Sequence, residues 1–259
     1  MVYSTKKTQR GTMKIKSLGH LSPSTINLFI RDKAQFIMKL SGVEYKGSFA
    51  TVRGQAVEKA VLQSVFYKNR SLEDSIKIAS DYFQEETLLS KIEKNEKYDK
   101  EKTTISDYVL NAIPTYQSIQ DEPLEMQRKI ELKLDEVQLP IIGYIDIEFE
   151  NHIRDLKTTK VIKSSVPHSV QRQLSIYSKA VGKDAWVDYV SPKKIISSKI
   201  INVENNIQEV ITICKGIEKL LSISDDIQEI ASMFYPNLDS WEWDKESINQ
   251  ARRIWSIKK

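Results

Sequence analysis

The sequence predicts a mixed α/β (α+β) fold in which a small central mixed β-sheet is flanked by many helices. Apolar residues recur at helical spacing through the first half of the chain, up to about residue 122. From Ile130 the period changes to two, and segments rich in β-branched residues follow. Helical and extended patterns then alternate up to about residue 203. Sheet segments interleaved with helices in this way are typical of layered folds with one core.

The chain has 259 residues, of which 40% are hydrophobic and 29% charged, as in an ordinary globular protein. We expect a basic N-terminal arm over residues 1–20 and a single domain over 21–259. That domain divides into a helical part (21–122), a β-rich core (123–203) and C-terminal helices (204–259). No apolar run approaches the roughly 20 residues that cross a bilayer, and no signal-peptide core begins the chain. We therefore expect a cytoplasmic protein that has no membrane partner.

Helices dominate the first half. Ser22, before an apolar periodic run, predicts a helix from about residue 24 to 40. A second helix is expected from about Gly54, and a third over 72–91. Residues 91–103 are almost wholly polar and predict an exposed turn or a frayed helix end, before a further helical stripe over 105–116.

Strands and helices alternate in the second half. Alternation and β-branched content predict strands at 130–134, 141–149, 152–158, 186–190 and 195–203. Helical spacing predicts helices at 167–181, 207–221, 227–234 and 244–257.

The segment from Gly143 to Thr158 predicts a hairpin with Glu150-Asn151 at its turn, because Asn tolerates the left-handed backbone that such a turn needs. The resulting register pairs 149 with 152 and 146 with 155. Asp146 then lies opposite Asp155, with Cβ atoms about 5 Å apart. Lys157 points to the same face, two residues further along the strand. The opposite face carries the apolar residues and is expected to be the core face: Ile145, Ile147, Phe149 and Leu156.

Two carboxylates at this distance repel each other and need a counter-charge. A divalent cation with a preference for oxygen ligands, Mg²⁺ or Mn²⁺, supplies it. Such an ion polarises phosphoryl oxygens and activates a bound water, and the ammonium of Lys157 orients or deprotonates that water or offsets developing charge. The alternative is a solvated β-face on which Lys157 pairs with Asp146 or Asp155.

The sequence motif Asp146…Asp155-Leu156-Lys157 resembles the signature of the PD-(D/E)XK nuclease superfamily. With Gly143 and Thr158 it is similar to the RecB-like branch, which includes CRISPR-associated and phage exonucleases. Three further segments resemble family motifs and occur along the chain in the family's order: Leu21-Ser22-Pro23-Ser24 with Phe36, Arg53 to Glu58, and Gln173-Leu174-Ser175-Ile176-Tyr177. Together they cover roughly residues 21–190. The resemblance implies a restriction-endonuclease-like core, with residues 123–203 as the catalytic core.

The resemblance also implies roles for single residues. Asp146 and Asp155 are expected as metal ligands, with the backbone carbonyl of Leu156 as a further ligand. Lys157 is expected as the catalytic lysine. Gln173 and Tyr177 lie on one helix face, and we expect them to contact DNA or to brace the site. The alternative is that Tyr177 is a core ring and Gln173 a buried amide.

The chain departs from the family at two points. Glu58 stands where many relatives have His; we expect it to be a metal ligand, the alternative being a surface helix charge. Many relatives also hold an iron–sulfur cluster, but Asp32 falls where the first cysteine would be, and the chain has one cysteine, Cys214. We therefore expect no cluster, a buried thiol, and chain ends joined by ordinary packing through the tryptophans Trp241, Trp243 and Trp255.

The expected function is a Mg²⁺- or Mn²⁺-dependent DNA exonuclease of the phage or bacterial kind, serving recombination or repair. A structure-specific or nicking endonuclease on the same site is the first alternative. A nuclease-fold protein that binds DNA or a partner without cutting is the second. A recombinase or single-strand-binding protein is a possible partner. Basic side chains are expected at the DNA backbone: Lys6, Lys7, Lys160, Lys163, Arg172, Lys193 and Lys194.

Overall fold

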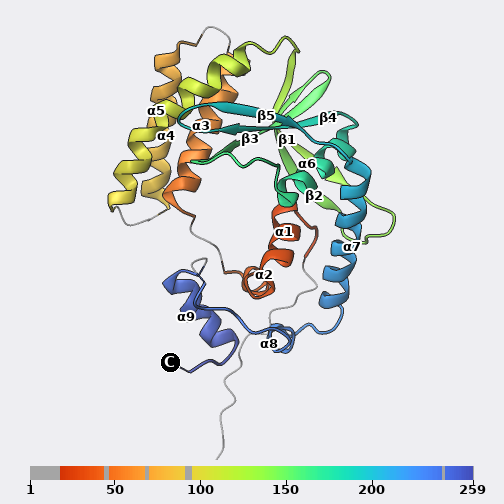
Figure 1. Ribbon diagram of the computed structural model, residues 1–259. Coiled ribbons are helices and arrows are strands. Elements are labelled where there is room, and N and C mark those ends of the chain that lie inside the picture. Colours follow the sequence, from red (N-terminus) through yellow and green to blue (C-terminus); the bar gives the residue numbers. More distant parts are fainter. Residues whose placement is uncertain (1–17, 44–46, 68–69, 91–94, 241–242, 259) are drawn as a thin grey trace, which may run out of the picture.

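The computed structural model describes residues 18–258, apart from residues 44–46, 68–69, 91–94 and 241–242. Most of the expected basic arm, including Lys6 and Lys7, lies outside the described residues, as does Trp241. Helices surround one five-stranded sheet (Figure 1), which confirms the mixed fold with a small central sheet. In the described part of the chain, no helix is long and apolar enough to cross a membrane.

The strands follow one another across the sheet in the order β1-β2-β3-β4-β5. All neighbours are antiparallel except β3 and β4, which are parallel and are joined through helix α6, so the sheet is mixed. The strand bounds are β1 Pro123–Leu132, β2 Ile141–Phe149, β3 His152–Thr158, β4 Asp184–Val190 and β5 Ile195–Lys199. The predicted strands at 141–149 and 152–158 are thus confirmed to the residue.

Helices cover both faces of the sheet. Their bounds are α1 Pro23–Arg31, α2 Lys33–Leu40, α3 Phe49–Phe66, α4 Leu72–Leu89, α5 Glu96–Gln117, α6 His168–Val181, α7 Val203–Leu221, α8 Ile227–Ala231 and α9 Lys245–Ile254. One core packs α3, α4 and α5 against Ile147, Phe149 and Leu156. A second core packs α1, α6 and α7 against Ile145 and Ile153. The expectation of one core face was therefore incomplete, because the acidic face of β3 is covered as well.

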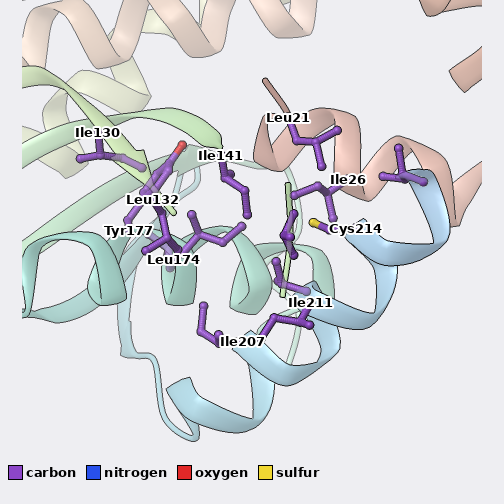
Figure 2. Close-up of a cluster of buried hydrophobic side chains, with 14 of the residues drawn as sticks. Leu21, Ile26, Ile130, Leu132, Ile141, Leu174, Tyr177, Ile207, Ile211 and Cys214 are labelled. Carbon is purple, nitrogen blue, oxygen red and sulfur yellow. The ribbon is translucent and has the colours of Figure 1, made fainter. Parts of the chain in front are cut away.

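The second core is shown in Figure 2, where Ile207 and Ile211 of α7 face Leu174 and Tyr177 of α6. Cys214 lies in the same cluster with no exposed surface, as expected of a buried thiol. Burial raises the pKa of this thiol to about 12, which makes it a poor nucleophile.

Two predicted helix boundaries were wrong. The helix expected over 24–40 is two helices, because Asp32 adopts an extended backbone (φ −154°, ψ 102°) and its side chain caps the next helix at the amide of Gln35. The exposed turn or frayed helix end expected over 91–103 is an ordered helix from Glu96 onward, where α5 begins with Asn95 as its N-cap; residues 91–94 lie outside the described residues. Tyr98 and Glu101 are buried on that helix, so tertiary packing overrides its polar composition.

The C-terminal segment packs back onto the first helices. The indole Nε1 of Trp243 donates a hydrogen bond of 3.2 Å to Oδ2 of Asp32, and Trp243 packs against Ala34 and Met38 of α2. Trp255 donates to the carbonyl of Phe234 over 2.6 Å. Packing of Trp243 and Trp255 in one cluster with Ala34 and Met38 therefore joins the C-terminal segment to α2, as expected for these two tryptophans.

Candidate active site

The β2–β3 hairpin brings Asp146 and Asp155 together. Its pairing runs through Glu148↔Ile153 and Ile147↔Arg154, which is the predicted register. Beyond the second pair, Oδ2 of Asp146 accepts a 2.9 Å hydrogen bond from the backbone amide of Leu156. The two acids thus lie at the same level of adjacent strands, and one of them is fixed by the backbone of the other's strand.

Asp155 is the most enclosed member of the site, with 1% of its surface exposed. Its Oδ1 accepts hydrogen bonds from Lys157 Nζ at 3.0 Å and from Gln173 Nε2 at 3.1 Å. Its Oδ2 lies 2.7 Å from the same ammonium as an ion pair but accepts no hydrogen bond of normal geometry. The Lys157 ammonium therefore contacts both carboxylate oxygens of Asp155.

The charges of this cluster raise one another's pKa. Desolvation, followed by the nearby Asp155 and Glu58, raises the pKa of Asp146 well above its usual range. Desolvation also raises the pKa of Asp155, although Lys157 opposes this. Burial by itself would lower the pKa of the Lys157 ammonium, but Asp155 and Asp146 raise it above its ordinary value. Beside these acids the charged form of Lys157 is therefore favoured.

Helix α6 forms the wall of the site. Nε2 of Gln173 also donates to the hydroxyl of Tyr177, one helical turn on, over 3.2 Å. A Cβ on Gly143 would lie 2.5 Å from Cε1 of Tyr177, so only glycine lets the ring lie against β2. Burial raises the pKa of Tyr177 to about 12, which keeps its hydroxyl protonated. The predicted pair Gln173 and Tyr177 therefore braces Asp155, and Tyr177 is also part of the core.

Glu58 approaches the acids from α3, the helix across the site. Burial first, and then Asp155, raises the pKa of Glu58 to about 7, while Lys157 and Gln127 counteract the rise. A third carboxylate therefore shares the electrostatic field of Asp146 and Asp155.

Gln127 was not anticipated from the sequence. The pairs Met126↔Ile147 and Arg128↔Ile145 place it opposite Asp146 on β1, and its φ is +53°. Its Nε2 donates a 2.6 Å hydrogen bond to Oε1 of Glu58. A left-handed non-glycine residue within a strand is uncommon and costs about 1–3 kcal/mol. The strained position lies beside the acids, and nothing in the local sequence indicates it.

The basic residues expected at DNA have different environments. Lys163, Lys193 and Lys194 are exposed. Lys160 is half-exposed but pairs with Glu101. Arg172 is buried, with its guanidinium bonded to Asn27 and to Glu209 at 2.9 and 2.7 Å. That side chain joins α6 to α1 and α7, and it is not free to contact a phosphate.

A buried ion network supports the end of β3. Arg53 of α3 is paired with Glu101 of α5, and it donates to Oγ1 of Thr158 over 3.3 Å. Burial by itself would raise the pKa of Glu101, but Lys160 and Arg53 together lower it below its usual value. A Cβ on Gly54 would lie 3.1 Å from the same Thr158 hydroxyl. These contacts hold α3, and hence Glu58, close to the strand that carries Asp155 and Lys157.

The donor set suits a hard divalent cation. Carboxylate oxygens of Asp146, Asp155 and Glu58 are the ligands that Mg²⁺ and Mn²⁺ prefer, and mutual repulsion favours their sharing a cation. Leu156, whose carbonyl is the further expected ligand, is buried in β3 between Asp155 and Lys157. Among the described residues, no three His, Cys, Asp or Glu side chains form a complete metal-holding group.

No protein-family model and no curated protein matches the chain. Among solved structures, it is similar to one entitled "Crystal structure of SSO0001", with 14% sequence identity and a TM-score of 0.36. That match covers 80% of this chain and 95% of the other. A likeness of this size carries no argument about activity, so the function must be inferred from the chain's own residues.

Proposed function

We propose that the protein is a metal-dependent DNA exonuclease of the PD-(D/E)XK type, acting in recombination or repair in the cytoplasm of a bacterial or phage-infected cell. The observation that carries the proposal is the meeting of Asp146, Asp155 and Lys157 at one point of the β2–β3 hairpin. Glu58 adds a third acid from α3. The site thus combines oxygen donors for a hard cation with an ammonium beside them.

The residues have separate roles in this proposal. Asp146, Asp155 and Glu58 hold Mg²⁺ or Mn²⁺, and the bound cation supplies the Lewis acidity for phosphodiester hydrolysis. Lys157, kept protonated by the acids, stabilises negative charge on the attacked phosphate. Gln173 restricts the orientation of Asp155, because its amide donates to Oδ1. Exposed Lys163, Lys193 and Lys194 provide contacts to the DNA backbone, whose affinity then falls with salt.

The test is incubation of the purified protein with linear DNA labelled at the 5′ or 3′ end, in Mg²⁺, Mn²⁺ or EDTA. We expect cleavage with either metal and none in EDTA. Lys157→Met should lower kcat by about 10²–10³ while DNA binding persists. Lys133→Met, which removes an exposed lysine of the β1 end, is the matched control. Cleavage by Lys157→Met at the native rate would contradict the catalytic assignment.

A covalently closed circular DNA separates the alternatives. An exonuclease leaves the circle intact, whereas a structure-specific or nicking endonuclease opens it. A protein that only binds DNA retards the linear fragment in a gel but releases no nucleotides at any metal concentration.

A further inference from the structure

A cavity of about 370 Å³ adjoins the acids. It lies between the start of α1, the strands β1 and β2, and helix α6. Among the side chains that line it are Pro23, Lys129, Ile142, Tyr144, Gln173 and Tyr177. We call it the α1–β2 cavity. The functional roles assigned above do not account for it.

The cavity and the acids share a wall. Gln173 lines the cavity and donates to Oδ1 of Asp155 with the same amide that donates to Tyr177. The ring of Tyr177 lies against Gly143 of β2, which also lines the cavity. A molecule held in the cavity is therefore separated from the buried acid by one amide side chain.

Strand β2 connects the cavity with the acids. Tyr144, which lines the cavity, precedes Asp146 by two residues, which is about 7 Å along the strand. Regular alternation does not continue between them, because Ile145 packs in the core with α6 and Ile147 packs in the core with α3, α4 and α5. A ligand seated on Tyr144 therefore lies a short distance along β2 from the acids.

The chemistry of the lining suits a nucleotide. Tyr144 has 53% of its surface exposed, so its ring is accessible to a ligand in the cavity. Ile142 and Pro23 add apolar surface, and Lys129 lies directly opposite Tyr144 across the β1–β2 pairing. No described lining residue is acidic. An aromatic face with a neighbouring cation is what stacks a base and attracts its phosphate.

We propose that the α1–β2 cavity binds one unpaired nucleotide next to the bond that is cut, with its base stacked on Tyr144. The inference rests on the proposed nuclease function and adds a substrate class to it. A cavity of this volume is at the small end of the range of about 300–1,000 Å³ for sites that enclose a small organic molecule. A single base fits this volume, and we expect the enzyme to act on single-stranded or frayed DNA.

The binding test uses the full chain in EDTA with single-stranded oligonucleotides that carry 2-aminopurine at successive positions from each end. Stacking on an aromatic ring quenches this fluorescent base. We expect quenching at one position in the native protein and in Tyr144→Phe, and its loss in Tyr144→Ala. Tyr235→Ala, which removes a tyrosine that is 80% exposed on the C-terminal segment, is the matched control and should behave as native.

The cleavage test compares a single strand with a blunt duplex in Mn²⁺. Tyr144→Ala should raise KM for the single strand about tenfold, since stacking on an aromatic ring is worth about that factor or more. The preference of Tyr144→Ala for the single strand over the duplex should fall by the same factor, while its kcat changes little. Native-like quenching and KM in Tyr144→Ala would overturn the inference and leave the nuclease proposal standing. Failure of the native protein to bind or cut any DNA would overturn both.

Discussion

The backbone amide of Leu156 donates a 2.9 Å hydrogen bond to the side chain of Asp146. The bond is made where the ladder between β2 and β3 ends, one residue beyond Ile147↔Arg154. Asp146 is thereby held by the main chain of the strand that carries Asp155 and Lys157. The orientation of this carboxylate is therefore fixed by the main chain of the neighbouring strand.

Asp146→Asn should stabilise the protein in EDTA and remove its response to metal. Desolvation and the neighbouring acids disfavour the charged form of Asp146, so a neutral amide relieves repulsion and still accepts the Leu156 bond. A gain of 1 kcal/mol raises the melting temperature by about 2–4 °C in a protein of this size. Thermal melts with and without Mn²⁺ measure both effects.

Asp135→Asn is the control for this prediction, because Asp135 is an exposed acid away from the cluster. It should leave the melting temperature and the Mn²⁺ response unchanged. A lower melting temperature for Asp146→Asn in EDTA would show that the acid serves stability and not metal binding.

Gly143→Ala should disturb the α6 wall. The added Cβ would lie 2.5 Å from Cε1 of Tyr177, and overpacking of this kind costs about 1–3 kcal/mol. The displaced ring should also weaken the Gln173 contact with Asp155 and reduce cleavage. In a Tyr177→Leu background the same substitution should cost less, because the clashing ring is gone. Chemical denaturation of the four proteins gives the coupling energy, and strictly additive effects would contradict the predicted contact.

Glu101→Gln should lower the free energy of unfolding by about 3 kcal/mol, because it leaves the buried Arg53 guanidinium without its counter-charge. Lys160→Gln removes the other partner of Glu101, but that lysine is half-exposed and should cost less than about 1 kcal/mol. Urea denaturation compares the two variants. Equal losses of unfolding free energy in the two variants would mean that Lys160, and not Arg53, is the partner through which Glu101 stabilises the protein.

The stability of the hairpin should fall as the pH falls below about 6.5. Nδ1 of His152 lies 2.8 Å from Asp121, while its Nε2 accepts a bond from Arg154 Nε at 3.0 Å, so the neutral ring fits its partners. Burial, opposed by Asp121, lowers the pKa of His152 below its usual value. Stability is thus complete above the unfolded pKa and is lost as the pH falls through the folded one.

His152→Gln should remove this part of the pH dependence between about pH 7.5 and about pH 5, measured as the urea midpoint. His168→Gln, at an exposed residue of α6, should retain it. An unchanged slope in His152→Gln would assign the acid sensitivity to other groups.

The hairpin could be predicted from the sequence because its information is local. Alternation before the turn at Glu150-Asn151, together with the position of that turn, leaves one register that buries Ile147 and Phe149, and the observed pairs match it. The spacing of Gln173 and Tyr177 places both on one face of α6, and the amide of Gln173 bonds Asp155 and Tyr177 there.

The supporting contacts could not be predicted in this way. Arg53 meets Glu101 across 48 residues of sequence, and Gln127 meets Glu58 across 69, so no periodic pattern contains either pair. The break at Asp32 was missed for a related reason: its side chain caps α2 while also accepting the Trp243 bond from the far end of the chain. Side-chain pairing between distant segments decides these features.

The most direct test of the central claim is a crystal structure of the protein grown with MnCl₂, with diffraction measured at the manganese absorption edge. We predict an anomalous peak within ligand distance of carboxylate oxygens of Asp146 and Asp155, near Glu58, and no such peak in Asp146→Asn. A map with no manganese between the two acids, or with the ion bound elsewhere, would contradict the account.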